Sequence, residues 1–218
     1  MRITLDTLTL PGELALPSRP HGMVIFAHGS GSNRHSPRNQ FVAHALNEAG
    51  FATLLFNLLT PGEESTDTPD CHLRFDIHLL SGRLESATRW IVEQPATHAL
   101  PRGYFGASTG GAAALVAAAE LGEAISAVVC RGGRPDLAGL ALPRVLAPTR
   151  LIVGERDTTV LNLNRQALSV LQCVADLGVV PGASHLCEEP GALEETATLA
   201  TAWFRLHLRR SPRRKSRV

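Results

Sequence analysis

Apolar residues in this chain follow two patterns that alternate along the sequence. Short apolar runs, typical of strands buried on both faces of a parallel sheet, occupy 22–27, 51–56 and 125–130, and two further strands are predicted at 149–153 and 174–180. Stretches with apolar residues at helical spacing lie among them, at 38–49, 75–93, 160–171 and 193–208. Because strands alternate with helices, we expect an α/β fold with a mostly parallel sheet and helices on both of its faces.

Two segments depart from this alternation. Residues 3–16 alternate apolar and polar positions around Pro11 and Gly12, which predicts an opening β-hairpin with its turn at that dipeptide. Residues 60–71 are rich in Pro, Glu, Thr and Asp, and they predict a polar surface loop. We find no internal repeat and no linker, so the pattern predicts one domain over residues 1–208.

Basic residues are concentrated at the end of the chain. Six of them lie within 209–218, so the formal net charge of +1 on the whole chain becomes −5 for residues 1–208 without them. We interpret 209–218 as a basic, disordered tail, and contact with nucleic acid or acidic lipid is the alternative. We expect no nucleic-acid partner and no membrane partner.

The amino terminus has no continuous apolar region of the kind found in signal peptides, and no apolar stretch is long enough to cross a bilayer. The four cysteines show neither CxxC nor zinc-like spacing, which favours reduced thiols in a cytoplasmic protein. The nine histidines are scattered. We therefore predict no metal site and no cofactor.

One short motif carries the strongest chemical signal. Gly106-x-Ser108-x-Gly110 lies between an apolar strand end at 103–105 and a helix of small residues at 112–121. This order is typical of a nucleophile elbow, in which a serine on a sharp strand-to-helix turn presents its hydroxyl at the end of the sheet. A serine that merely caps the helix is the alternative interpretation.

An elbow serine needs a base to remove its proton and an acid to orient that base. Both follow in the expected order, because Asp157 comes after strand 149–153 and His185 comes after strand 174–180. Asp136 and Glu155 are alternatives for the acid, with Asp157 then serving as a helix cap. His28 competes with His185, and we interpret it as fixing its own loop by hydrogen bonding.

The chain resembles the alpha/beta-hydrolase superfamily and, within it, the small dienelactone-hydrolase-like proteins. The motifs behind the resemblance are His-Gly-Ser-Gly at 28–31, Gly-Ala-Ser-Thr-Gly at 106–110, Gly-Glu-Arg-Asp at 154–157 and Gly-Ala-Ser-His at 182–185. The resemblance implies Ser108 as nucleophile, His185 as base and Asp157 as the orienting acid. It also implies an oxyanion hole formed by the backbone N–H groups of Ser30 and Thr109.

Dienelactone hydrolases proper are expected to have cysteine where this chain has Ser108, and this departure favours a general ester or thioester hydrolase. Only a short segment lies where larger hydrolases insert a lid domain, between Cys130 and Thr149, so we expect an open site and a small-molecule ester substrate. An acyltransferase with the same three residues and a non-catalytic binding or scaffold protein are the alternatives. Arg131 and Arg134 are expected to be solvated, and binding of an acidic part of a substrate is the other interpretation.

Overall fold

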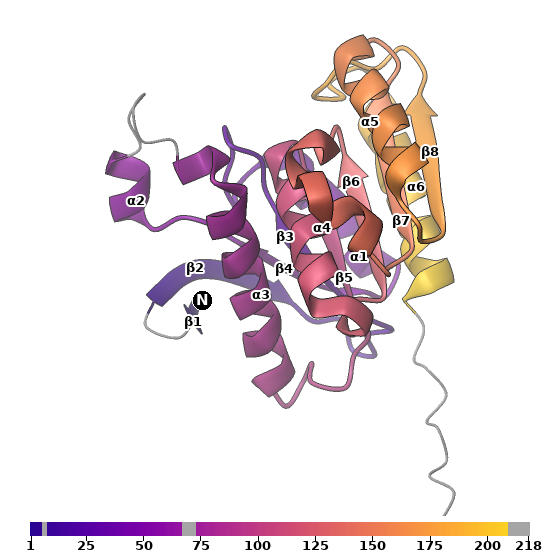
Figure 1. Ribbon diagram of the computed structural model, residues 1–218. Coiled ribbons are helices and arrows are strands. Elements are labelled where there is room, and N and C mark those ends of the chain that lie inside the picture. Colours follow the sequence, from indigo (N-terminus) through magenta and orange to yellow (C-terminus); the bar gives the residue numbers. More distant parts are fainter. Residues whose placement is uncertain (6–7, 67–72, 209–218) are drawn as a thin grey trace, which may run out of the picture.

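The computed structural model describes residues 1–5, 8–66 and 73–208, and the centre of this part of the chain is an eight-stranded sheet (Figure 1). The order of its strands is β1-β2-β4-β3-β5-β6-β7-β8. Strand β2 runs antiparallel to both of its neighbours, β1 and β4, and all other neighbouring strands are parallel. The predicted, mostly parallel α/β sheet is confirmed. The strands are β1 (Arg2–Leu5), β2 (Leu8–Ala15), β3 (Met23–Ala27), β4 (Ala52–Phe56), β5 (Arg102–Ala107), β6 (Ala127–Arg131), β7 (Thr149–Gly154) and β8 (Ala175–Val180).

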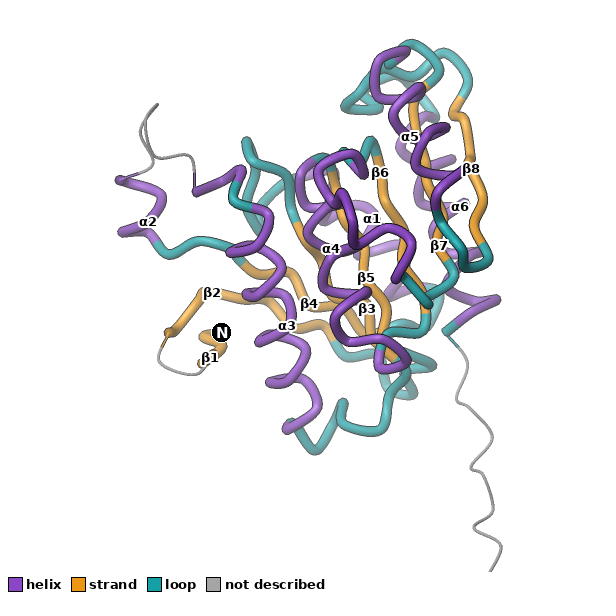
Figure 2. The backbone as a smooth tube through the Cα atoms, viewed as in Figure 1, coloured by secondary structure: helices purple, strands orange, loops and turns teal. Residues whose placement is uncertain are grey.

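Helices cover both faces of the sheet, as predicted (Figure 2). Helices α3, α4 and α5 pack on one face, and α1 and α6 pack on the other. The helical elements are α1 (Pro37–Glu48), α2 (Pro61–Thr66), α3 (Ile77–Glu93), α4 (Thr109–Leu121), α5 (Thr158–Val170), α6 (Ala192–His207) and the 3-10 segments η1 (Leu73–Phe75), η2 (Gly122–Ala124) and η3 (Pro135–Arg144).

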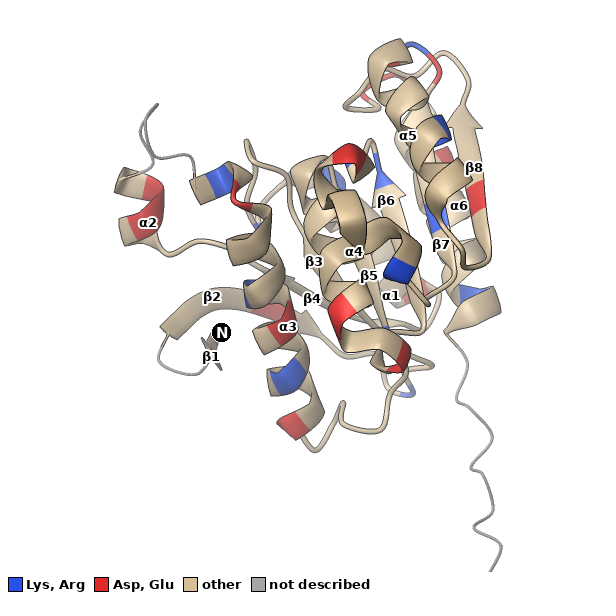
Figure 3. Cartoon of the chain, viewed as in Figure 1, with Lys and Arg blue, Asp and Glu red and all other residues tan. Residues whose placement is uncertain are grey.

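The continuous apolar runs exist because the central strands are buried on both faces. In β3, Met23 and Ile25 belong to the core beneath α3 and α4, whereas Val24 and Phe26 belong to the core beneath α1 and α6. Strands β3 and β4 carry no charged residue (Figure 3). Alternate side chains of β3 therefore serve two different cores, so all five of its positions are apolar.

The predicted turn at Pro11 and Gly12 is wrong, because β2 runs straight through both residues. Pro11 lies opposite Arg2 of β1, and Gly12 lies opposite Phe56 of β4. The dipeptide thus marks the point where β2 changes its hydrogen-bonded neighbour. Proline has no N–H to donate, so it fits a place where the ladder passes from one strand to another.

The predicted loop over 60–71 is also partly wrong, because Pro61–Thr66 forms helix α2. Thr60 accepts a hydrogen bond from the N–H of Glu63 at 3.1 Å, and the Glu63 carboxylate accepts one from the N–H of Thr60 at 2.8 Å. This reciprocal pair is a capping box, which stabilises the first turn of a helix. Residues 67–72 lie outside the described part of the chain.

The connection between β6 and β7 contains the short segment η3, so no large lid covers this edge of the sheet in the described residues. None of the described helices combines the length and the apolar character needed to span a bilayer. The predicted basic tail, 209–218, lies outside the described residues.

Candidate active site

Ser108 lies at the turn between β5 and α4, as predicted for the elbow. Its backbone has φ 52° and ψ −122°, and its side chain does not cap the helix. A positive φ in a residue with a side chain costs on the order of 1–3 kcal/mol, so neighbouring structure must stabilise the turn. The Ser108 N–H donates to the carbonyl of Arg131 and the Ser108 carbonyl accepts from the N–H of Arg134, both at 3.1 Å. Ser108 is therefore braced by the segment that follows β6.

Close backbone packing explains the glycines around this turn. A Cβ atom on Gly110 would lie 2.1 Å from the carbonyl oxygen of Ala27, and one on Gly106 would lie 2.5 Å from the carbonyl oxygen of Gly110. A Cβ atom on Gly29 would lie 3.1 Å from Cβ of Ser108. The ends of β3, β5 and α4 can approach this closely only because these three residues lack side chains.

His185 and Asp157 contact each other at the same edge of the sheet. Nδ1 of His185 lies 2.5 Å from Oδ2 of Asp157. A carboxylate can only accept, so Nδ1 carries a proton, and in the neutral imidazole Nε2 is then the acceptor. Asp157 occupies the N-cap position of α5, yet its side chain makes no capping hydrogen bond there.

The other two carboxylates considered for this position have different partners. Both oxygens of Asp136 accept from the guanidinium of Arg134, at 2.8 and 2.7 Å. Glu155 accepts from the N–H of Gly182 at 2.8 Å. Of the three candidates, Asp157 is the one in contact with His185 in the described residues.

The loop that carries His185 is anchored from two directions. Glu189 accepts from the N–H of Ser184 at 2.9 Å and also pairs with Arg156. The backbone N–H of Ser184 is the main reason why the pKa of Glu189 falls to about 2, so this carboxylate stays ionised in ordinary buffers. From the other side, Nη1 of Arg131 donates to the carbonyl of His185 at 3.1 Å.

The expectation that Arg131 is a solvated surface residue is wrong. Arg131 is the last residue of β6, is only 5% exposed, and has no carboxylate partner among the described residues. Burial lowers the pKa of its guanidinium. Its position could have been recognised, because it directly follows the apolar run of the strand beside β5. Arg134, in contrast, pairs with Asp136 at the surface.

Ser108, Arg131 and His185 line one cavity of about 210 Å³, which we call the serine cavity. Ser30 and Leu186 also line it. No hydrogen bond joins Ser108 Oγ to His185 in the described structure, which is common for catalytic pairs without substrate. The cavity thus contains an unpaired hydroxyl, an imidazole oriented by a carboxylate and a buried guanidinium.

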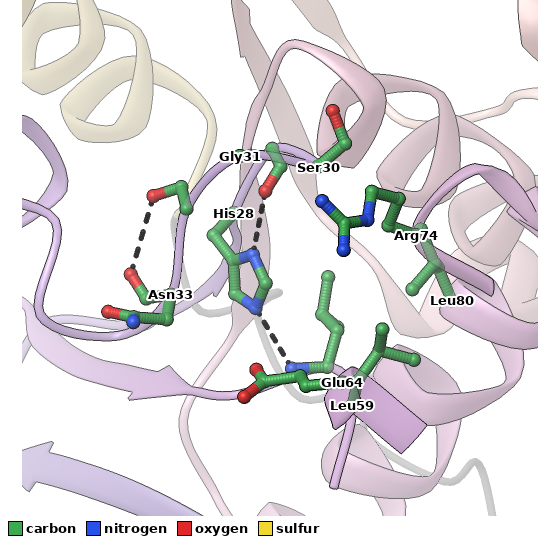
Figure 4. Close-up of a pocket in the computed structure, with 11 residues that line it drawn as sticks. His28, Ser30, Gly31, Asn33, Leu59, Glu64, Arg74 and Leu80 are labelled. Carbon is green, nitrogen blue, oxygen red and sulfur yellow. Dashed lines mark hydrogen bonds between the residues drawn. The ribbon is translucent and has the colours of Figure 1, made fainter. Parts of the chain in front are cut away.

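His28 fixes the loop at 28–32, as interpreted from the sequence (Figure 4). Nε2 accepts from the N–H of Leu58 at 3.0 Å, and Nδ1 lies 2.9 Å from the carbonyl oxygen of Gly29. Because the first partner can only donate and the second can only accept, the ring is neutral with its proton on Nδ1. Burial lowers the pKa of His28, which favours the same neutral form.

The two predicted oxyanion residues come from different elements. Ser30 lines the serine cavity from the 28–32 loop, and Thr109 is the first residue of α4. The first amides of a helix have no partner within it, so the N–H of Thr109 is available to a negatively charged atom. No cluster of three or more His, Cys, Asp or Glu side chains suited to a metal ion occurs in the described residues.

Comparison with known proteins places these features in a family. Residues 22–191 match the family model described as alpha/beta hydrolase fold. A dienelactone hydrolase from Anabaena variabilis is 55% identical, with a TM-score of 0.93 over 96% of this chain and 97% of that chain. Est1E from Butyrivibrio proteoclasticus is 17% identical, with a TM-score of 0.77 over 94% and 97% of the two chains, and shares the fold.

Two curated proteins from Mycobacterium tuberculosis strains CDC 1551 and H37Rv are 55% identical over 208 residues, and both are provisionally named phosphoribosyl transferases. The alignment covers 95% of this chain but 46% of each relative, so the chain spans about half the length of these proteins. The family-model match over most of the chain, together with its similarity to a dienelactone hydrolase, shows that the chain belongs to the alpha/beta hydrolase fold family and is dienelactone-hydrolase-like.

Proposed function

We propose that this chain is a serine hydrolase that cleaves small carboxylic esters or thioesters, with Ser108 as nucleophile, His185 as base and Asp157 as the orienting acid. The observation that carries the proposal is the 2.5 Å contact between Asp157 and His185 at the edge of a cavity that also contains Ser108. The conformation of Ser108 supports the proposal further. Its backbone is strained and its side chain does not cap α4, so a role as an ordinary helix cap does not explain this residue.

In the proposed acylation step, Ser108 Oγ attacks the ester carbonyl while Nε2 of His185 takes the hydroxyl proton. Asp157 stabilises the imidazolium that forms. The negative charge on the carbonyl oxygen is bound by the backbone N–H groups of Ser30 and Thr109, each worth about 3 kcal/mol in comparable sites.

The tetrahedral intermediate then collapses, and its C–O or C–S bond breaks. His185 returns the proton to the departing alcohol or thiol, and Ser108 remains as an acyl ester. A water molecule, activated by His185, attacks this ester and releases the carboxylic acid. None of these steps requires a cofactor.

The size of the site supports small substrates. The serine cavity measures about 210 Å³, below the range of about 300–1,000 Å³ typical of drug-sized ligands. The segment η3 is all that separates β6 from β7, so the described residues supply no lid domain that could enclose a long lipid. The provisional name of the curated relatives does not extend to this chain, because more than half of each relative lies outside the alignment.

The test is hydrolysis of p-nitrophenyl acetate by wild type, Ser108→Ala and the exposed control Ser169→Ala. We expect Ser108→Ala to lose at least about 1,000-fold in kcat with an unchanged circular dichroism spectrum, since the nucleophile is gone. Ser169→Ala should retain wild-type turnover. Turnover by a folded Ser108→Ala protein would remove this residue from the role. A folded wild type that hydrolyses no ester and resists a serine-directed phosphonate would favour the scaffold alternative.

A further inference from the structure

A second cavity lies across the 28–32 loop from the serine cavity. It measures about 310 Å³, and its apolar lining comes from Leu58, Leu59 and Leu80, so we call it the leucine cavity. Figure 4 shows its lining residues around a common space, with His28 on one side and Arg74 and Leu80 on the other. Nothing in the catalytic scheme above uses this space.

The two cavities share one wall. Gly29, Ser30, Gly31 and Ser32 line both of them. Gly29 packs directly against the nucleophile, since a Cβ atom there would lie 3.1 Å from Cβ and 3.8 Å from Oγ of Ser108. A carbonyl carbon attacked by Ser108, with its oxygen on the N–H of Ser30, is therefore positioned at the boundary between the two cavities.

The direction of proton transfer separates the two halves of an ester. His185 must protonate the leaving oxygen, so the alcohol half has to lie on the His185 side, within the serine cavity. The acyl chain leaves the carbonyl carbon in a different direction from that oxygen. The neighbouring space that shares Gly29 and Ser30 with the serine cavity is the leucine cavity.

We infer that the leucine cavity is the acyl subsite of this chain and that it selects short, neutral, apolar acyl groups. The inference rests on the proposed serine hydrolase activity. Leu58, Leu59 and Leu80 form the apolar part of the lining, Ser32 and Asn33 are polar, and Glu64 and Arg74 contribute one charge of each sign. The charged residues that line the cavity are thus one acid and one base, and its lining carries no excess of basic side chains for an anion. A volume near the lower end for ligand sites limits the chain to a few carbons.

Acyl length and alcohol length should therefore have separate determinants. Each methylene that enters the leucine cavity leaves water, which corresponds to a rise in kcat/KM of about fourfold until the cavity is full. Methylene groups added to the alcohol half enter the serine cavity instead, where Leu186 is the apolar lining residue.

The experiment measures kcat/KM for two ester series with wild type, Leu80→Phe, Leu80→Ala and Leu186→Phe. One series is p-nitrophenyl acetate, butyrate and hexanoate, and the other is methyl, butyl and hexyl acetate. We expect the butyrate-to-acetate ratio to fall at least about tenfold in Leu80→Phe and the hexanoate-to-butyrate ratio to rise in Leu80→Ala. Leu186→Phe should leave the acyl ratios unchanged and lower the butyl-to-methyl ratio.

A ratio of kcat/KM values for two esters, measured on one variant, does not depend on how much of that variant is folded. The two Leu80 variants are expected to change the acyl ratios in opposite directions, and destabilisation cannot produce both changes. Unchanged acyl ratios in both Leu80 variants, with esters still hydrolysed, would overturn the inference. A change confined to the alcohol series would overturn it as well, because the leucine cavity would then receive the leaving group. Absence of hydrolysis by wild type would instead refute the proposed function on which the inference rests.

Discussion

At the scale of single residues, burial gives His28 a pH-dependent role in stability. Its pKa is lowered from the usual value of about 6.5 because burial disfavours the charged ring. The unfolded chain therefore takes up this proton at a higher pH than the folded chain. The contribution of His28 to stability is complete above about pH 6.5 and is lost as the pH falls through the lower, folded-state pKa.

We predict that the free energy of unfolding decreases between pH 7.5 and 5.5, and that His28→Asn reduces this dependence. One such histidine accounts for at most about 1.4 kcal/mol per pH unit. Urea unfolding at both pH values measures the effect. The control is His44→Asn, since His44 is exposed and pairs with Glu48 at the surface. An equal pH dependence in wild type and His28→Asn would contradict the prediction.

Arg131 is a second residue whose burial determines its role, and its environment differs from the solvated one expected from the sequence. Its guanidinium donates to the carbonyl of His185, while its own carbonyl accepts from the N–H of Ser108. Gly132, the next residue, packs so closely that a Cβ atom would lie 3.2 Å from Cε1 of His185. The end of β6 thus connects the proposed nucleophile with the proposed base.

We predict that Arg131→Met lowers kcat on a neutral ester about 10- to 100-fold, because a small displacement of His185 misaligns proton transfer. KM should change little, since a neutral substrate gains nothing from the guanidinium. The fold should persist, because an apolar side chain replaces a buried charge without a carboxylate partner. The control is Arg144→Met, which removes an exposed pair with Glu120. A rise in KM at constant kcat would indicate substrate binding instead.

At the scale of elements, the end of β5 packs so closely against the start of α4 that there is no room for a side chain between the two backbones. We predict that Gly106→Ala lowers the free energy of unfolding by more than about 3 kcal/mol, since its Cβ would collide with the backbone of Gly110. Gly82 in α3 is the matched control, because an added Cβ there would meet no atom within 4 Å apart from the neighbouring backbone of its own helix. Gly82→Ala should raise stability by about 0.5–1 kcal/mol. Urea unfolding compares the two variants, and equal effects would show that the packing at Gly106 is not rigid.

At the scale of the whole molecule, one sheet separates two apolar cores, and the two tryptophans report on them separately. Trp90 of α3 packs against the core beneath α3 and α4, and Trp203 of α6 belongs to the core on the other face. Because β3 to β7 contribute alternate side chains to both, neither core can form without the sheet.

We predict that Trp90→Phe and Trp203→Phe, each with a single remaining tryptophan, show the same midpoint by fluorescence as by circular dichroism within each variant. Coincident transitions are expected of one cooperative unit. The measurement is urea unfolding of both variants. Two midpoints within one variant would mean that the faces unfold separately, against the predicted single domain over residues 1–208.

The sequence by itself determined most of the helices and strands and the order of the candidate catalytic residues. Continuous apolar runs predict doubly buried strands because a strand with helices on both faces has no polar side. The Gly-x-Ser-x-Gly turn and the later positions of Asp157 and His185 were readable because parallel strands bring their carboxyl ends to one edge. These signals are local or follow from chain order.

Only the tertiary structure decided the strand pairing at Pro11 and Gly12, the burial of Arg131 and the carboxylate partner of His185, because each depends on contacts between segments that are distant in the sequence. Pro11 and Gly12 look like a turn in isolation, but the neighbouring strands β1 and β4 make them a point of exchange within β2. Arg131 carries a charge typical of the surface, yet the elbow and the His185 loop enclose it. The choice of Asp157 over two nearby carboxylates depends on which oxygen reaches His185, and chain order alone does not determine that distance.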